Sequence, residues 1–134
     1  GHNHRNDLSS AVLIKDNHIL AAGGIRPAIE RARALAPHTS RIECEVDDLT
    51  GLAEAIEAGA DIVLLDNMND ETIAEAVFFT KSRALLEASG GITLERVFAL
   101  STLGVYAISV GALTHSVQSA DIGLDFDLPP GPNA

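Results

Sequence analysis

The sequence has few of the residues that support disulfides or the stacking of nucleic-acid bases. Its 134 residues include one cysteine, one tyrosine and no tryptophan. A single cysteine cannot form an internal disulfide, or a zinc site built on several cysteines, so we expect a reducing, cytoplasmic setting. The scarcity of aromatic rings removes the platforms on which unpaired bases stack.

Positive charge is also scarce. Nine lysines and arginines stand against nineteen acidic residues, which gives a net charge of −10. Binding to a phosphate backbone or an anionic membrane requires basic patches, so we expect neither nucleic acid nor a membrane as a partner. No apolar run approaches the ~20 residues of a membrane span. Lys15 and Lys81 are the only two lysines, so their positions are informative.

Apolar strand patterns and helical patterns alternate along the chain, with a spacing typical of βαβ units and a parallel sheet. Asp70 and Thr93 are placed to cap two of the helices. Two architectures fit: an open doubly wound sheet, or a portion of a parallel β/α barrel, which when complete needs ~200 residues or more. We predict the barrel portion. The expected strands are 11–15, 42–46, 61–66, 85–89 and 106–110, and the expected helices are 25–35, 49–58, 71–80 and 94–103.

The expected domain organisation is one α/β unit. We expect residues 1–127 to form a fragment of a barrel catalytic domain, without its first strand. Residues 128–134 are rich in proline and glycine, and we expect a loose tail there.

Polar or small residues close the predicted strands. In β/α barrels the reactive groups lie at the carboxyl ends of the strands, so these positions are candidates for one site on one rim. A single polar residue at such a position is ordinary, but four in succession indicate a site. The strand-end residues are Lys15, Glu45, Asp66, Ser89 and Gly111.

Two glycine-containing loops follow the last two predicted strands. Ser89, Gly90 and Gly91 lie between a strand and a helix, and Gly111 opens the second loop, which leads to His115. Glycine lets backbone N–H groups approach an anion, and a helix N-terminus behind the loop favours negative charge. The two loops therefore predict a phosphate site.

Glu45 and Asp66 end neighbouring predicted strands. Paired carboxylates in that position can hold Mg²⁺, directly or through water, or accept hydrogen bonds from ribose hydroxyls. The pattern equally allows Asp66 to cap the following helix. Both interpretations remain open at this point.

His4, Arg5 and Lys15 gather cationic or titratable groups around the first predicted strand. In a chain of net negative charge this indicates an anionic ligand, although Arg5 is also consistent with a solvated surface arginine. His18 is expected on a loop at the rim.

The two-residue period of strands places further acids on the inner face of the sheet. Glu43 shares its face with Glu45, and Glu87 shares its face with Ser89, so both are expected to point into the barrel. Cys44 alternates to the other face and is expected to be an unreactive thiol packed against a helix.

Seven segments in this order and spacing closely resemble the quinolinate phosphoribosyltransferase family. The resemblance runs from Asn3 to about Asp127, nearly the whole chain, and the ordered set is highly specific. The segments are Asn3–Arg5, Ala11–His18, Glu43–Val46, Leu64–Met68, Leu86–Thr93, Ser109–Ser116 and Asp121–Asp125.

The resemblance implies a reaction. The pyridine nitrogen of quinolinate would attack the anomeric carbon of phosphoribosyl pyrophosphate, with loss of pyrophosphate and CO₂ and with Mg²⁺ as cofactor. The product would be nicotinate mononucleotide, in NAD biosynthesis. The resemblance also implies a homodimer or a higher homo-oligomer, and an N-terminal domain with a basic segment that these residues do not include.

Carried over by motif position, the resemblance gives each candidate a role. His4, Arg5 and Lys15 would hold the quinolinate carboxylates, and Glu45 and Asp66 would take the ribose hydroxyls and Mg²⁺. The phosphate end would be bound by Ser89, Gly90, Gly111 and His115.

Three alternative interpretations remain. A related phosphoribosyltransferase-like protein associated with molybdate transport shares the barrel and the phosphate loops. Nicotinate phosphoribosyltransferase is a more distant relative without decarboxylation. The third is that the chain is a truncated, non-catalytic piece. Arg5 and Lys15, as cations for two carboxylates, favour quinolinate.

Overall fold

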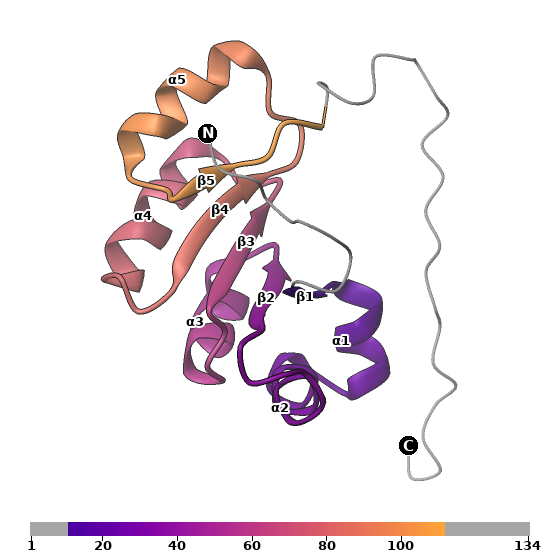
Figure 1. The fold of residues 1–134 in the computed structure, drawn as a ribbon. Coiled ribbons are helices and arrows are strands. Elements are labelled where there is room, and N and C mark those ends of the chain that lie inside the picture. Colours follow the sequence, from indigo (N-terminus) through magenta and orange to yellow (C-terminus); the bar gives the residue numbers. More distant parts are fainter. Residues whose placement is uncertain (1–10, 112–134) are drawn as a thin grey trace, which may run out of the picture.

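A computed structural model describes residues 11–111, in which five parallel strands alternate with helices (Figure 1). Every strand pairs in parallel with the next strand along the chain, so the sheet order is β1-β2-β3-β4-β5. The elements are β1 (Ala11–Ile14), α1 (Asp16–Ala22), α2 (Ile25–Leu35), β2 (Arg41–Val46), α3 (Leu49–Glu57), β3 (Ile62–Asp66), α4 (Asp70–Thr80), β4 (Leu85–Ser89), α5 (Leu94–Leu103) and β5 (Ala107–Ile108).

The strand order decides between the two architectures that the sequence allowed. A doubly wound sheet reverses its strand order at a switch point. Here the order never reverses, and the colours of the strands in Figure 1 pass steadily from indigo to orange across the sheet. The described residues therefore form part of a parallel β/α barrel, as predicted, and the doubly wound alternative is wrong.

One face of the sheet forms the hydrophobic core with the helices. Ile42 and Cys44 in β2, Val63 and Leu65 in β3, and Ala88 in β4 are fully buried on this face. They occupy alternate positions along their strands, as the two-residue period requires. Burial of Cys44 confirms the expectation that its side chain packs on the helix side.

The opposite face is the inner side of the barrel and carries carboxylates. Glu43 and Glu45 lie on it in β2, and the register places Leu64 of β3 beside both Glu45 and Glu87. Glu43 and Glu87 are buried, and Glu87 accepts a hydrogen bond from the hydroxyl of Ser109. The predicted inward orientation of both acids is confirmed.

The start of α4 differs from the prediction by one residue. Asn69, not Asp70, is the N-cap, and its side-chain oxygen accepts a hydrogen bond of 2.8 Å from the backbone N–H of Thr72. Asp70 is instead the first helical residue, and its carboxylate binds Arg96 of α5. Thr93 caps α5 as predicted, accepting from the Arg96 N–H at 3.4 Å.

The last predicted strand is shorter than expected. The pattern over 106–110 predicted five residues, whereas β5 contains only Ala107 and Ile108. These two residues pair with Glu87 and Ala88 of β4, and among residues 11–111 no strand pairs with the other edge of β5. None of the helices in this range is long and apolar enough to cross a bilayer.

Candidate active site

Four of the predicted strand-end residues meet at one edge of the sheet. Lys15 directly follows β1, Glu45 is the second-last residue of β2, and Asp66 and Ser89 end β3 and β4. Asp66 and Ser89 are direct partners in the register, and Glu45 pairs with Leu64, two residues before Asp66. The side chains of Glu45, Asp66 and Ser89 therefore share the inner face.

Lys15 and Glu45 form an ion pair across β1 and β2. The lysine Nζ lies 3.4 Å from Oε2 of Glu45, whose side chain is 18% exposed. Partial burial raises the pKa of the Glu45 carboxyl, the Lys15 ammonium opposes that rise, and the negative charge of Asp66 adds to it. Burial is the largest of these effects, so the pKa of Glu45 is above its ordinary value despite the lysine.

Helix α1 holds the backbone of Lys15 in place, and the sequence did not predict it. His18 was expected on a loop, but it lies in α1, which Lys15 caps and which ends at Gly23 in the left-handed conformation (φ 86°). Nδ1 of His18 accepts a hydrogen bond of 3.0 Å from the Lys15 N–H. The helix has only seven residues, too few for a clear periodic pattern, so only the Gly23–Gly24 pair marked its end.

A cavity of about 490 Å³ opens at this edge, and its lining is strongly acidic. Lys15 is the cation that contacts its carboxylates among the described residues. Such a lining repels a polyanion unless further positive charge enters with the ligand or from elsewhere in the protein. The acidic residues that line it are Asp16, Glu45, Asp47, Asp48, Glu54 and Asp66.

Asp66 does not cap the helix that follows it. Helix α4 is capped by Asn69, three residues further on, so the Asp66 carboxylate is left for the inner rim. Asn67 follows it in the left-handed conformation (φ 53°). Asparagine tolerates this conformation better than most residues, and it turns the chain sharply after β3.

Asn67 also explains the glycine at position 90. Its backbone N–H donates to the Ser89 carbonyl at 3.1 Å, which joins the β3–α4 and β4–α5 loops. A Cβ on Gly90 would lie 2.6 Å from both the backbone N and Oδ1 of Asn67, and Gly90 has φ +80°. The glycine that was predicted for phosphate approach is thus required first by loop packing.

Gly111 has a different environment from Gly90. A Cβ added there would meet no atom of residues 11–111 within 4 Å, and its φ is not in the left-handed region. Neither loop packing within these residues nor backbone conformation therefore requires a glycine at this position. The other predicted ligands of the two substrate ends, His4, Arg5 and His115, lie outside the described residues.

Comparison with known proteins places this geometry in a family. A sequence profile described as "Quinolinate phosphoribosyl transferase, C-terminal domain" matches residues 1–125. The chain belongs to this family. It is 46% identical over 128 residues to the probable nicotinate-nucleotide pyrophosphorylase [carboxylating] of Bacillus subtilis, covering 96% of this chain and 44% of that protein.

Further quinolinate phosphoribosyltransferase relatives agree. Human nicotinate-nucleotide pyrophosphorylase [carboxylating] is 40% identical, covering 90% of this chain and 42% of the human protein. The crystal structure of NadC from Streptococcus pyogenes superimposes with a TM-score of 0.80 at 43% identity, covering 90% of this chain and 42% of that one. The chain thus spans less than half the length of these relatives.

The acidic rim of this family member suits Mg²⁺. Magnesium is usually held by one or two carboxylates together with substrate phosphates and water, and Glu45 and Asp66 provide two such carboxylates. Within residues 11–111 no three acidic, histidine or cysteine side chains are arranged to hold a metal alone. The donor set fits an ion that arrives with a phosphorylated substrate.

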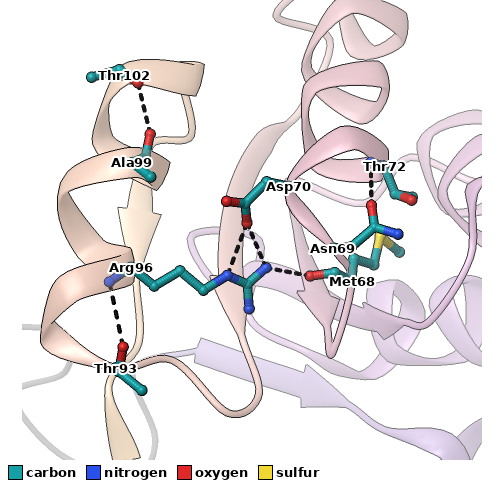
Figure 2. Close-up of polar contacts among 8 residues, drawn as sticks. All are labelled: Met68, Asn69, Asp70, Thr72, Thr93, Arg96, Ala99 and Thr102. Carbon is teal, nitrogen blue, oxygen red and sulfur yellow. Dashed lines mark hydrogen bonds and ion pairs between the residues drawn. The ribbon is translucent and has the colours of Figure 1, made fainter.

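Sequence reasoning missed two residues that shape this quinolinate phosphoribosyltransferase rim, Asn67 and Arg96. Arg96 lies in the first turn of α5, where the helix dipole disfavours positive charge. An arginine in that position indicates a specific partner, so its place in the predicted helix could have identified Arg96 from the sequence. The partners are Asp70 and the carbonyl of Met68 (Figure 2).

Cys44 is expected to be almost inert in the folded protein. Burial, with the charges of Glu45 and Glu54, raises the pKa of its thiol to about 11. Only about one thiol in a thousand is then ionised at pH 8. We expect iodoacetamide to modify Cys44 rapidly in denaturant and at least ~100-fold more slowly in the native protein, measured by mass spectrometry. Equal rates in both states would contradict this placement.

Proposed function

We propose that the full-length protein carrying this chain transfers the phosphoribosyl group of phosphoribosyl pyrophosphate to quinolinate, with decarboxylation. The products are nicotinate mononucleotide, pyrophosphate and CO₂, in NAD biosynthesis. The observation that carries the proposal is the group formed by Lys15, Glu45 and Asp66 on the same rim as the Ser89–Gly91 loop. The names of the relatives, which specify a carboxylating pyrophosphorylase, support this reaction over the molybdate-associated alternative.

The two substrates would occupy opposite ends of the rim. We assign the quinolinate carboxylates to Lys15, helped by His4 and Arg5. We assign the phosphate end to the loop at Ser89 and Gly90, helped by Gly111 and His115. The distribution of charge supports this polarity, because Lys15 lies at the β1 side of the site and the glycine loop lies three strands away.

Glu45 and Asp66 lie between these ends and would face the ribose. Loss of pyrophosphate leaves positive charge on the anomeric carbon, and fixed carboxylates stabilise that charge as it develops. Their oxygens can also accept hydrogen bonds from the ribose hydroxyls. A bound Mg²⁺ would neutralise the pyrophosphate and make it a better leaving group.

The decarboxylation needs little catalytic machinery of its own. Once the pyridine nitrogen is bonded to the ribose, it carries a formal positive charge beside the carbon that holds the 2-carboxylate. The electron pair left by departing CO₂ is stabilised by that charge and then takes up a proton. The residues of the rim contribute by holding the two substrates in the reactive orientation.

We also propose that the protein acts as a homodimer or a larger homo-oligomer in the cytoplasm, as the family resemblance implies. The single cysteine, which is buried and free, is compatible with a reducing compartment.

The function is tested by mixing full-length protein with quinolinate, phosphoribosyl pyrophosphate and Mg²⁺. Labelled CO₂ and nicotinate mononucleotide should appear in equal amounts, and neither should appear when any one component is omitted. A protein that binds these substrates without turnover would support the non-catalytic alternative. Nicotinate used in place of quinolinate should give no product.

Asp66→Asn should lower kcat by about ten- to a hundredfold while the protein stays folded. The amide keeps the size of the side chain but removes the charge that stabilises the ribose cation and helps to hold Mg²⁺. Initial rates as a function of Mg²⁺ concentration measure the effect, and thermal melting checks the fold. Glu75→Gln, an exposed change on α4, is the matched control. Normal turnover with normal Mg²⁺ dependence in Asp66→Asn would remove Asp66 from the mechanism.

A further inference from the structure

The loop that follows Asp66 and the glycine loop at the proposed phosphate end are joined at more than one point. Asp66 and Ser89 are register partners at the ends of β3 and β4. Immediately beyond them, the Asn67 N–H donates to the Ser89 carbonyl, and Gly90 packs against Asn67 without room for a side chain. The backbone immediately after Asp66 is therefore held against the backbone of the glycine loop.

Arg96 makes a second junction, between α5 and the segment that follows Asp66 (Figure 2). From the first turn of α5 its Nε donates to Oδ1 of Asp70 at 2.8 Å, and its Nη2 donates to the Met68 carbonyl at 2.5 Å. Met68 and Asp70 both belong to the segment that follows Asp66. The helix that follows the glycine loop is thus bound directly to the segment that comes after Asp66.

Arg96 is less exposed than the arginines of the other two arginine ion pairs found among residues 11–111. The Arg96 side chain is 25% exposed, against 46% for Arg26 and 44% for Arg33. Oδ1 of Asp70 lies 2.8 Å from both Nε and Nη2 of Arg96, and Nη2 also donates to the Met68 carbonyl, so the rigid guanidinium fixes an orientation as well as a distance. The charge also opposes the dipole of α5, so the acceptors Asp70 and Met68 are what hold it there.

We propose that Arg96 is a positioning residue, which sets the distance between the Asp66 carboxylate and the phosphate loop at Ser89–Gly91. This inference rests on the proposed function, because it matters only if one substrate spans both loops. Phosphoribosyl pyrophosphate does so, with its ribose at Asp66 and its 5′-phosphate at the glycine loop. Quinolinate, at the Lys15 side, does not touch the joined loops.

The consequence is an asymmetric kinetic effect. A misplacement of about 1 Å between a bound group and a catalytic group can cost on the order of a hundredfold in rate. Loss of the Arg96 contacts should therefore lower kcat and raise the KM for phosphoribosyl pyrophosphate. It should leave the KM for quinolinate nearly unchanged. A residue that only stabilised the fold would not separate the two substrates in this way.

The test compares Arg96→Met, Arg96→Lys and Asp70→Asn in the full-length protein. Arg83→Met is the matched control, because Arg83 also binds two backbone carbonyls, those of Thr80 (3.1 Å) and Phe79 (3.0 Å), but at the opposite edge of the sheet. We expect Arg96→Met to lose about ten- to a hundredfold in kcat/KM for phosphoribosyl pyrophosphate. Arg96→Lys should recover part of it, because lysine can keep the Asp70 contact only.

Amide hydrogen exchange provides a readout that does not depend on activity. In Arg96→Met the exchange of the Asn67 N–H, which bonds to Ser89, should be faster by at least about tenfold, while Arg83→Met should leave it unchanged. If the wild-type protein makes no product but Asn67 N–H exchange is still faster in Arg96→Met, the proposed function is wrong. The role of Arg96 in holding the two loops together is then still supported.

Two results would overturn the proposal. One is unchanged Asn67 exchange in Arg96→Met. The other is an equal rise in the KM of both substrates, accompanied by the same drop in melting temperature as in Arg83→Met. Either would make Arg96 a contributor to stability without a positioning role.

Discussion

Gly90→Ala should destabilise the protein by about 2–5 kcal/mol, because two costs coincide at this position. The residue has φ +80°, a left-handed conformation that disfavours a side chain. The new Cβ would also stand 2.6 Å from the backbone N and Oδ1 of Asn67, so the two loops would have to separate. Urea unfolding followed by circular dichroism measures the loss, and activity should fall with it as Asp66 moves away from the glycine loop.

Gly59→Ala separates the cost of the left-handed conformation from the cost of the steric clash. Gly59 has nearly the same conformation, φ +88°, but a Cβ there would meet no atom of the described part of the chain within 4 Å. It should therefore show only the conformational cost of roughly 1–2 kcal/mol. If Gly90→Ala is no more destabilising than Gly59→Ala, the contact with Asn67 carries no energy and the loops are not tightly packed.

Lys15→Ala should weaken quinolinate binding by roughly ten- to over a hundredfold, since a charge-assisted contact contributes about 1.5–3 kcal/mol. Binding of phosphoribosyl pyrophosphate should change much less. Titration calorimetry of the full-length protein with each substrate measures both. Lys81→Ala, which changes the other lysine at the far end of α4, is the control and should leave both affinities unaltered.

Lys15→Ala should also shift the pH dependence of kcat/KM to higher pH on its acidic side. The Lys15 ammonium opposes the rise that burial imposes on the pKa of Glu45, so without the lysine that pKa should rise further. If the ionised Glu45 carboxylate is the active form, activity is lost as the pH falls through its pKa. The acidic limb of the kcat/KM profile should therefore move to higher pH in Lys15→Ala. A shift to lower pH, or none, would show that the pair does not control this limb.

The barrel and the composition of its rim could be predicted from the sequence because both depend on local patterns. The two-residue period of a strand decides which face each side chain is on, and it places Glu45, Asp66 and Ser89 on the same face. The alternation of strands and helices brings the carboxyl ends of the strands to one edge of the sheet. The strands and the four longer helices followed from the same signals. The ordered motifs then indicated the family, which the relatives confirm.

What could not be predicted depends on contacts between distant segments or on very short elements. Arg96 is 26 residues from Asp70 and 28 from the carbonyl of Met68, and no pattern links them. The seven-residue helix α1 was missed, so the His18 contact to the Lys15 backbone was missed too. Aspartate is a common N-cap, which favours Asp70 from the sequence, but Asn69 caps α4 and the Asp70 carboxylate binds Arg96.

The alternation of the two faces has a consequence for how the site can change over generations or in the laboratory. Glu45, Asp66 and Ser89 each follow a fully buried neighbour in sequence, namely Cys44, Leu65 and Ala88. A codon change at one of these three positions alters a side chain on the inner face, whereas a change at the codon before it alters a side chain of the hydrophobic core. We therefore expect single substitutions at positions 45, 66 and 89 to change activity at a smaller cost in stability than substitutions at the preceding positions. A randomised library should be built on those three positions and should leave the preceding residues untouched.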